Sequence, residues 1–247
     1  MRAAAVELRS VSAATDARPL TAIELDVGAG DAVVVIGLPG AGKTSLVRLI
    51  AGLDEVAAGS LSLFGQDLAH VGYFKARSLR DRVAVVFERG GIWTNRSVAE
   101  NLVLPVAYRT DRSLATLLSD SYLHDLLDAL DLRGIAERPT ASLDDSERRR
   151  VLLVRALYTK PDLLLVDEPQ AALSRAHMRL FAALIERERR ARGMTVILTD
   201  ADGRIDPFEA DRPIILHERR ILQGAVRLPE RSSASTPPHD AARENTP

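Results

Sequence analysis

Apolar residues along this chain fall into two kinds of pattern: short uninterrupted runs and segments with helical spacing. The runs Ala32–Ile36, Leu163–Val166 and Thr195–Leu198 are rich in β-branched residues and leucine, which is typical of strands buried on both faces of a parallel sheet. Helical spacing occurs at 46–50, soon after the first run, and at 117–132, where leucines recur every three or four residues. The pattern predicts buried strands followed by amphipathic helices.

The loop after the first run reads GLPGAGKTS and fits the phosphate-binding pattern G-x-x-x-x-G-K-[ST] at every fixed position. In this pattern the glycines let backbone N–H groups wrap phosphates, the lysine supplies charge to the β- and γ-phosphate oxygens, and the threonine supplies a hydroxyl for Mg²⁺. A glycine-rich turn without function is the alternative, but the strand before the loop and the helix after it disfavour that reading. The predicted nucleotide-binding residues are Gly37, Leu38, Pro39, Gly40, Ala41, Gly42, Lys43, Thr44 and Ser45.

A second candidate site follows the run Leu163–Val166, where the chain continues as Asp167-Glu168-Pro169. At the C-terminal end of a parallel strand beside a phosphate loop, Asp167 would hold Mg²⁺ directly or through water, together with Thr44. Glu168 would polarise the attacking water and is the predicted catalytic residue. The alternative is a strand followed by a charged turn, and the phosphate loop earlier in the chain argues against it.

Composition narrows the class of protein. The 247 residues suffice for one large domain, and 46% hydrophobic content is ordinary for a globular chain. A formal net charge of -1 argues against a nucleic-acid-coating protein, and the lack of cysteine excludes disulfides and thiolate metal sites. No apolar run approaches the roughly 20 residues that span a bilayer, and the start MRAAAVELRS lacks the apolar region of a secretory signal. Any membrane role is therefore expected to come through a partner.

Three stretches together resemble the nucleotide-binding subunits of ABC transporters: GLPGAGKTS, SERRRVLLVRALYTKPDLLLVDEPQAAL and MTVILTDAD. The resemblance implies an α/β fold of the P-loop NTPase class, with a RecA-like core around a parallel sheet, an antiparallel β subdomain and an inserted helical subdomain. It also implies ATP and Mg²⁺ as ligands. The stretch VVFERGGIWTNRSVAENLVLPV is in addition similar to the ATPase subunits of Mla- and Mce-associated lipid transporters.

Pattern and resemblance together predict the domain organisation. Residues 1–228 are expected to form the ATP-binding domain, with the helical subdomain at about 89–150. Residues 229–247 are rich in proline, serine and charge without any apolar period, which predicts a disordered tail. The expected elements are strands at Ala4–Leu8, Thr21–Val27 and Ala32–Ile36, and helices around Ser97–Leu104, around Leu117–Leu132 and after Ser146.

The chain departs from the family pattern at positions that normally convert ATP binding into hydrolysis. Glu88 stands where the family has a glutamine that touches Mg²⁺, so this carboxylate is a third candidate metal ligand. Asp200 stands where the family has a histidine that contacts the γ-phosphate. The other two such departures are Leu143-Asp144-Asp145-Ser146-Glu147 in place of the signature LSGGQ and Ala171-Ala172-Leu173-Ser174 in place of S-A-L-D. The adenine-stacking aromatic of the family is also missing, with Thr15 near its place.

The replaced signature has a physical consequence at the start of its helix. Asp144 and Glu147 are three residues apart, as in a capping box that bonds the free N–H groups of a helix N-terminus to the chain's own carboxylates. Against a γ-phosphate from an opposite subunit, Asp144 and Asp145 would also repel, by about 4 kcal/mol for two unit charges about 4 Å apart at a dielectric of about 20. A well-capped helix with no phosphate role is the favoured interpretation.

The resemblance implies an ATP-binding subunit that couples MgATP binding and hydrolysis to a permease, with importer-type or lipid transport as the candidate systems. The departures at the positions above predict that this hydrolysis is slow. Its expected partners are a transmembrane permease and a second ATPase subunit, identical or different, at the cytoplasmic face of the inner membrane. A nonhydrolytic regulatory subunit that keeps MgATP is one alternative. A non-transport ABC ATPase working on nucleic acid or the ribosome is the other, which the single cassette and balanced charge disfavour.

Overall fold

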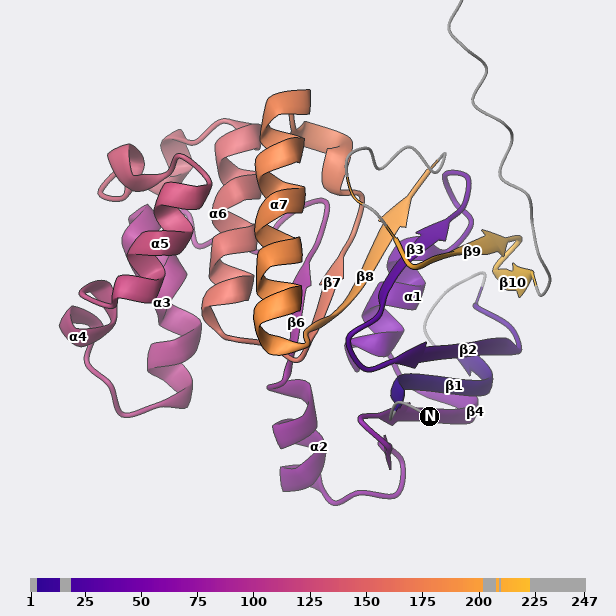
Figure 1. Ribbon diagram of the computed structural model, residues 1–247. Coiled ribbons are helices and arrows are strands. Elements are labelled where there is room, and N and C mark those ends of the chain that lie inside the picture. The colour runs from indigo at the N-terminus through magenta and orange to yellow at the C-terminus, as the bar shows by residue number, and fades with distance from the viewer. Residues whose placement is uncertain (1–3, 14–18, 202–207, 209, 223–247) are drawn as a thin grey trace, which may run out of the picture.

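A mixed sheet lies at the centre of the structure, a computed structural model that describes residues 4–13, 19–201, 208 and 210–222 (Figure 1). Within these residues the sheet has six strands, in the order β10-β9-β3-β8-β7-β6. Neighbouring strands from β9 to β6 pair in parallel, and β10 pairs antiparallel with β9 at one edge. The strands are β3 (Ala32–Ile36), β6 (Val83–Val86), β7 (Leu163–Val166), β8 (Thr195–Asp200), β9 (Arg212–His217) and β10 (Arg220–Leu222).

The central strands bury both of their faces, as their uninterrupted apolar runs predict. All five residues of β3 are buried, and they divide between two cores because successive side chains of a strand point to opposite faces. Val33 and Val35 pack in one core with α1 (Lys43–Ile50), while Val34 and Ile36 pack in the other with the helical part of the chain. The parallel core sheet of the predicted P-loop NTPase fold is therefore confirmed.

A second, antiparallel sheet covers α1 from the side away from the central sheet (Figure 1). Its described strands have the order β2-β1-β4-β5. The predicted strand at Ala4–Leu8 continues to Ala13, and the strand predicted from Thr21 begins at Ile23. The strands are β1 (Ala4–Ala13), β2 (Ile23–Gly28), β4 (Val56–Leu63) and β5 (Gln66–Asp67).

Helices cover the other face of the central sheet, with α6 and α7 to the left of β7 and β8 in the view of Figure 1. The helix predicted around Ser97–Leu104 runs on to Arg109, past an internal Pro105. The helices after α1 are α2 (Tyr73–Arg80), α3 (Val98–Arg109), α4 (Leu114–Leu118), α5 (Ser121–Ala129), α6 (Asp145–Tyr158) and α7 (Arg175–Arg192). The 3₁₀ turns lie at Arg133–Ile135, Thr140–Ser142 and Pro169–Ala172.

The prediction of one helix over Leu117–Leu132 is wrong, because the chain breaks between α4 and α5. Ser119 ends α4, and Asp120 starts α5 by accepting a hydrogen bond from Tyr122 N at 3.0 Å. Leu117 and Leu123 are nevertheless both buried, since the two helices place their leucines in the same core. The leucine period therefore reports a shared buried face and not one continuous helix.

Two predictions about the domain organisation, the C-terminal tail and the bounds of the helical subdomain, stay open. The tail 229–247 lies outside the described residues, and the boundary of the helical subdomain at about 89–150 remains a prediction. Within the described part of the chain, no helix combines the length and the apolar character that crossing a membrane requires.

Candidate nucleotide-binding site

The phosphate loop joins the C-terminal end of β3 to the first turn of α1. Gly42, the N-cap of α1, has φ +102°, a left-handed conformation that favours glycine. A Cβ on Gly37 would lie 2.5 Å from the backbone oxygen of Leu216, so this position has no room for a side chain. No side chain caps α1, and its first turn contains no acidic residue. The N–H groups at this helix start can therefore bind an anion.

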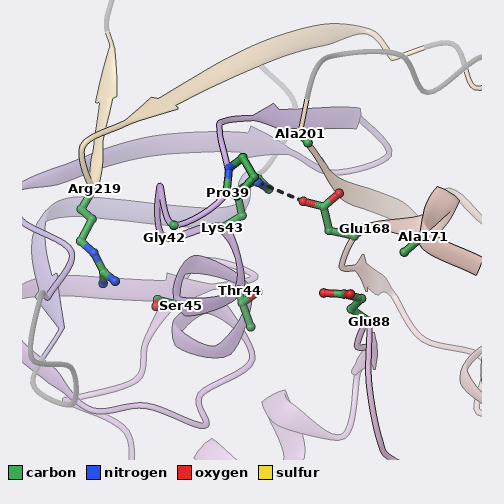
Figure 2. A pocket seen from close by; sticks show the side chains of 11 residues that line it. Pro39, Gly42, Lys43, Thr44, Ser45, Glu88, Glu168, Ala171, Ala201 and Arg219 are labelled. Carbon is green, nitrogen blue, oxygen red and sulfur yellow. Dashed lines mark ion pairs between the residues drawn. The ribbon is translucent and has the colours of Figure 1, made fainter.

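Lys43 is held at the centre of the loop. Its side chain is 6% exposed, and Nζ donates hydrogen bonds to the carbonyl oxygens of Gly37 and Leu38. Nζ also lies 3.0 Å from Oε1 of Glu168, the ion pair drawn in Figure 2. The ammonium group is thus fixed beside the predicted catalytic carboxylate.

Asp167 directly follows β7 and is 1% exposed. Thr44 Oγ1 donates to its Oδ2 at 2.7 Å, and Thr199 Oγ1 donates to its Oδ1 at 2.7 Å. Thr199 also accepts a hydrogen bond from Glu168 N at 3.0 Å, so one hydroxyl positions both carboxylate residues. The sequence analysis did not identify Thr199. Its position near the C-terminal end of β8, the strand next to β7, could have indicated a contact with Asp167.

The donor set around Thr44 and Asp167 fits Mg²⁺. A hydroxyl and a carboxylate oxygen are hard ligands, and Mg²⁺ in nucleotide sites typically takes one or two such protein ligands and completes its shell with phosphate and water. The described residues contain no group of three or more histidine, cysteine, aspartate or glutamate side chains placed to hold a metal ion. A magnesium ion here would therefore depend on the nucleotide's own oxygens.

Glu168 and Glu88 enter the site from the ends of β7 and β6. Glu168 has φ +47°, a left-handed conformation that is uncommon for a residue with a side chain and often marks a functional site. Glu88 is exposed, and its Oε1 lies 3.6 Å from Nε of its neighbour Arg89. Its assignment as a third magnesium ligand remains a prediction.

A cavity of about 490 Å³ opens over the loop, within the range of ordinary ligand sites (Figure 2). Glu88 and Glu168 lie at one end, and Arg219 lies at the other beside Gly42 and Ser45. Among the predicted loop residues, Gly37, Leu38 and Ala41 do not line it. The lining residues are Pro39, Gly40, Gly42, Lys43, Thr44, Ser45, Glu88, Glu168, Ala171, Ala201 and Arg219.

Arg149 of α6 contacts the backbone that carries the site carboxylates, and the sequence analysis did not predict this role. The residue is 2% exposed, and its guanidinium donates to the backbone oxygens of Phe87, Asp167 and Glu168, the last at 2.6 Å. Burial lowers the pKa of Arg149, and the charges of Asp167, Glu88 and Glu168 offset this only in part. An arginine stays charged in proteins because its ordinary pKa is so high. Through Arg149, helix α6 fixes the ends of both carboxylate-bearing strands.

Replacing Arg149 by methionine is expected to lower the free energy of unfolding by about 3 kcal/mol. The variant keeps much of the side-chain volume but leaves buried carbonyl oxygens without donors and the carboxylates without this cation. Urea unfolding at constant m-value measures the loss, and Arg179→Met on the exposed side of α7 is the matched control. Equal stability of the two variants would show that Arg149 does not hold the strands.

The replaced signature has the predicted capping box. Asp144 Oδ1 accepts from Glu147 N at 2.7 Å, and Glu147 Oε2 accepts from Asp144 N at 3.0 Å. Arg138 completes the arrangement with an ion pair to Glu147 at 2.9 Å. The start of α6 is thus closed by the chain's own carboxylates, whereas the start of α1 carries no side-chain cap.

The remaining departures lie at different places. Asp200 is completely buried, and its neighbour Ala201 lines the cavity instead. The carboxylate therefore does not face the cavity, contrary to what the position of the family's histidine predicts. Ala171 lines the cavity, while Ser174 caps α7 by accepting from His177 N at 3.2 Å. Thr15 lies outside the described residues.

Comparisons with known proteins agree with this geometry. The sequence profile described as ABC transporter matches residues 20–171, more than half of the chain. The methionine import ATP-binding protein MetN of Caulobacter vibrioides is 33% identical over 84% of this chain and 62% of its own length. The sulfate/thiosulfate import ATP-binding protein CysA of Bacillus cereus is 34% identical over 83% and 56%. The chain thus spans between half and two thirds of the curated relatives it matches.

Solved structures show the same fold. A dimeric bacterial ABC transporter cassette has a TM-score of 0.79 at 20% identity, covering 88% of this chain and 97% of its own. The protein cbiO1 of Clostridium perfringens, part of the transporter complex cbiONQ, has a TM-score of 0.75 at 18% identity, covering 90% and 88%. The relatives named above import methionine or sulfate, so they give the resemblance to lipid transporters no support. ATP with Mg²⁺ is the ligand of this family, and on its matching profile the chain belongs to the ABC transporter family.

Proposed function

We propose that the chain is the ATP-hydrolysing subunit of an import-type ABC transporter. The observation that carries this proposal is the arrangement of Lys43, Glu168 and Asp167 around a phosphate loop whose helix start is uncapped. The names of the relatives support import over export or lipid transport. Because the chain spans only part of their length, its activity, cargo and partners are inferred and need direct tests.

In the proposed reaction the loop N–H groups and Lys43 bind the β- and γ-phosphates of ATP. The ammonium group of Lys43 lies 3.0 Å from Oε1 of Glu168. A phosphate oxygen competes with this carboxylate for the ammonium group and replaces it when ATP binds. Glu168 is thereby freed to accept a proton from the attacking water. Thr44 and Asp167 would hold Mg²⁺, which neutralises charge on the phosphates.

Turnover is proposed to be slow. ABC subunits pair so that the signature helix of one faces the phosphate loop of the other, and here that helix begins with the closed capping box of Asp144 and Glu147. Its N–H groups are engaged internally, and two aspartates would approach the γ-phosphate. Pairing with a second subunit and with a permease at the cytoplasmic face of the membrane is part of the proposal, whether the pair is identical or not.

Restoring the signature is expected to raise ATP turnover by about tenfold or more, because it removes the repulsion of Asp144 and Asp145 against the γ-phosphate, which amounts to several kcal/mol. The combined variant is Asp144→Ser, Asp145→Gly and Ser146→Gly, in which serine retains a cap at position 144. Phosphate release at saturating MgATP measures it, with Asp125→Ser on the exposed face of α5 as the control that removes a distant charge.

The outcome separates the two functional candidates. A faster combined variant, with the control unchanged, supports an attenuated ATPase. No gain, while the protein still binds MgATP, would contradict attenuation and favour a subunit that keeps the nucleotide without hydrolysing it.

A further inference from the structure

The turn between β9 and β10 has a backbone conformation that its residues do not favour. Glu218 and Arg219 form the two central positions, with φ +44° and +63°, and the strands on either side pair through His217 and Arg220. A two-residue hairpin with both central residues left-handed prefers Asn-Gly or Gly-Gly. A large side chain at the second position is therefore strained, and strain of this kind gathers at functional sites.

The strained arginine lines the nucleotide cavity. Its backbone oxygen accepts a hydrogen bond from Thr21 N at 3.2 Å, which ties the turn to the start of the second sheet. A Cβ placed on Gly42 would lie 3.4 Å from Arg219 Cγ, so the side chain crosses the N-cap of α1. Figure 2 shows it on the side of the loop opposite Glu168 and Glu88.

The direction of a bound nucleotide follows from the two ends of the cavity. Lys43, Thr44 and the carboxylates mark the end that takes the β- and γ-phosphates and the metal. The ribose and base must then extend past Gly42 and Ser45, toward Arg219. Among the described residues that line the cavity, Arg219 alone carries a planar side chain on this side.

Strands β1 to β4 offer no aromatic ring for the base, because no phenylalanine, tyrosine or tryptophan precedes Phe64 in the sequence. A guanidinium group is flat, always charged and stacks on aromatic faces. We propose that Arg219 is a nucleotide-binding residue whose guanidinium stacks on the purine base of ATP. This inference rests on the proposed function, since it assumes that the loop binds MgATP.

Titration of MgATP and of magnesium tripolyphosphate, which lacks a base, tests the role of Arg219. Arg219→Gly is expected to weaken MgATP binding about tenfold, the size of one well-placed cation–π contact, and to leave tripolyphosphate binding unchanged within about twofold. Arg219→Lys keeps the charge and a weaker cation–π contact but loses the flat surface, so its MgATP affinity should fall between those of the wild type and the glycine variant. Arg220→Ala, the exposed neighbour in the same hairpin, is the matched control.

Folding does not confound the test, because glycine suits the left-handed position and Arg219→Gly is expected to unfold at no lower temperature than the wild type. Unchanged MgATP affinity of Arg219→Gly, or an equal loss for tripolyphosphate, would overturn stacking on the base. Failure of the wild-type chain to bind MgATP would instead overturn the proposed function.

Discussion

Lys43→Ala is expected to weaken MgATP binding by about 100-fold or more, which corresponds to about 2.7 kcal/mol. Lys43 is the buried cation of the phosphate loop, and its ammonium group is already fixed by two carbonyl oxygens and by Glu168. Because this position is preorganised, the charge reaches the phosphates without further reordering of the side chain. Titration of MgATP by calorimetry measures the loss.

Lys75→Ala on the exposed face of α2 is the control for the lysine variant, and its MgATP affinity should equal that of the wild type. Circular dichroism of both variants verifies that the fold is retained. Wild-type affinity in Lys43→Ala would mean that the nucleotide binds somewhere other than the loop.

Glu168→Gln is expected to lower ATP turnover by about 10²- to 10⁴-fold, the usual contribution of a general base. Glutamine keeps the size of the side chain but cannot take a proton from water. The variant also loses the ion pair with Lys43, so MgATP binding should be unchanged or tighter, because the ammonium group no longer has a competing carboxylate. Phosphate release and calorimetric titration on the same preparation separate these two effects.

Glu55→Gln, an exposed glutamate after α1, is the matched control for the loss of one negative charge. Turnover in Glu168→Gln equal to that of this control would remove Glu168 from the role of base. Loss of both binding and turnover would indicate a structural role for the residue.

The local parts of the fold and site were predictable because their signals lie in short stretches of sequence. Buried β3 follows from five consecutive apolar residues, and the phosphate loop follows from its glycines and Lys43. The capping box of α6 is likewise a local pattern, with Asp144 and Glu147 three residues apart. Such features depend on neighbours along the chain, which the sequence displays directly.

The residues that were missed act across long separations in sequence. Arg149 contacts Phe87 and Glu168, and Thr199 contacts Asp167, because α6, β6, β7 and β8 meet at one edge of the sheet. Arg219 reaches Gly42 only through the pairing of β9 with β3. The break at Ser119 was missed for a different reason, since the leucine period continues across it.

The most direct test of the account is ATP turnover by the purified chain, alone and with co-purifying partners, beside direct titration of MgATP and the Lys43→Ala control. The account predicts saturable MgATP binding and slow phosphate release, with binding weakened about 100-fold or more and phosphate release lost in the Lys43→Ala variant. Absence of MgATP binding, or turnover that persists unchanged in Lys43→Ala, would contradict it.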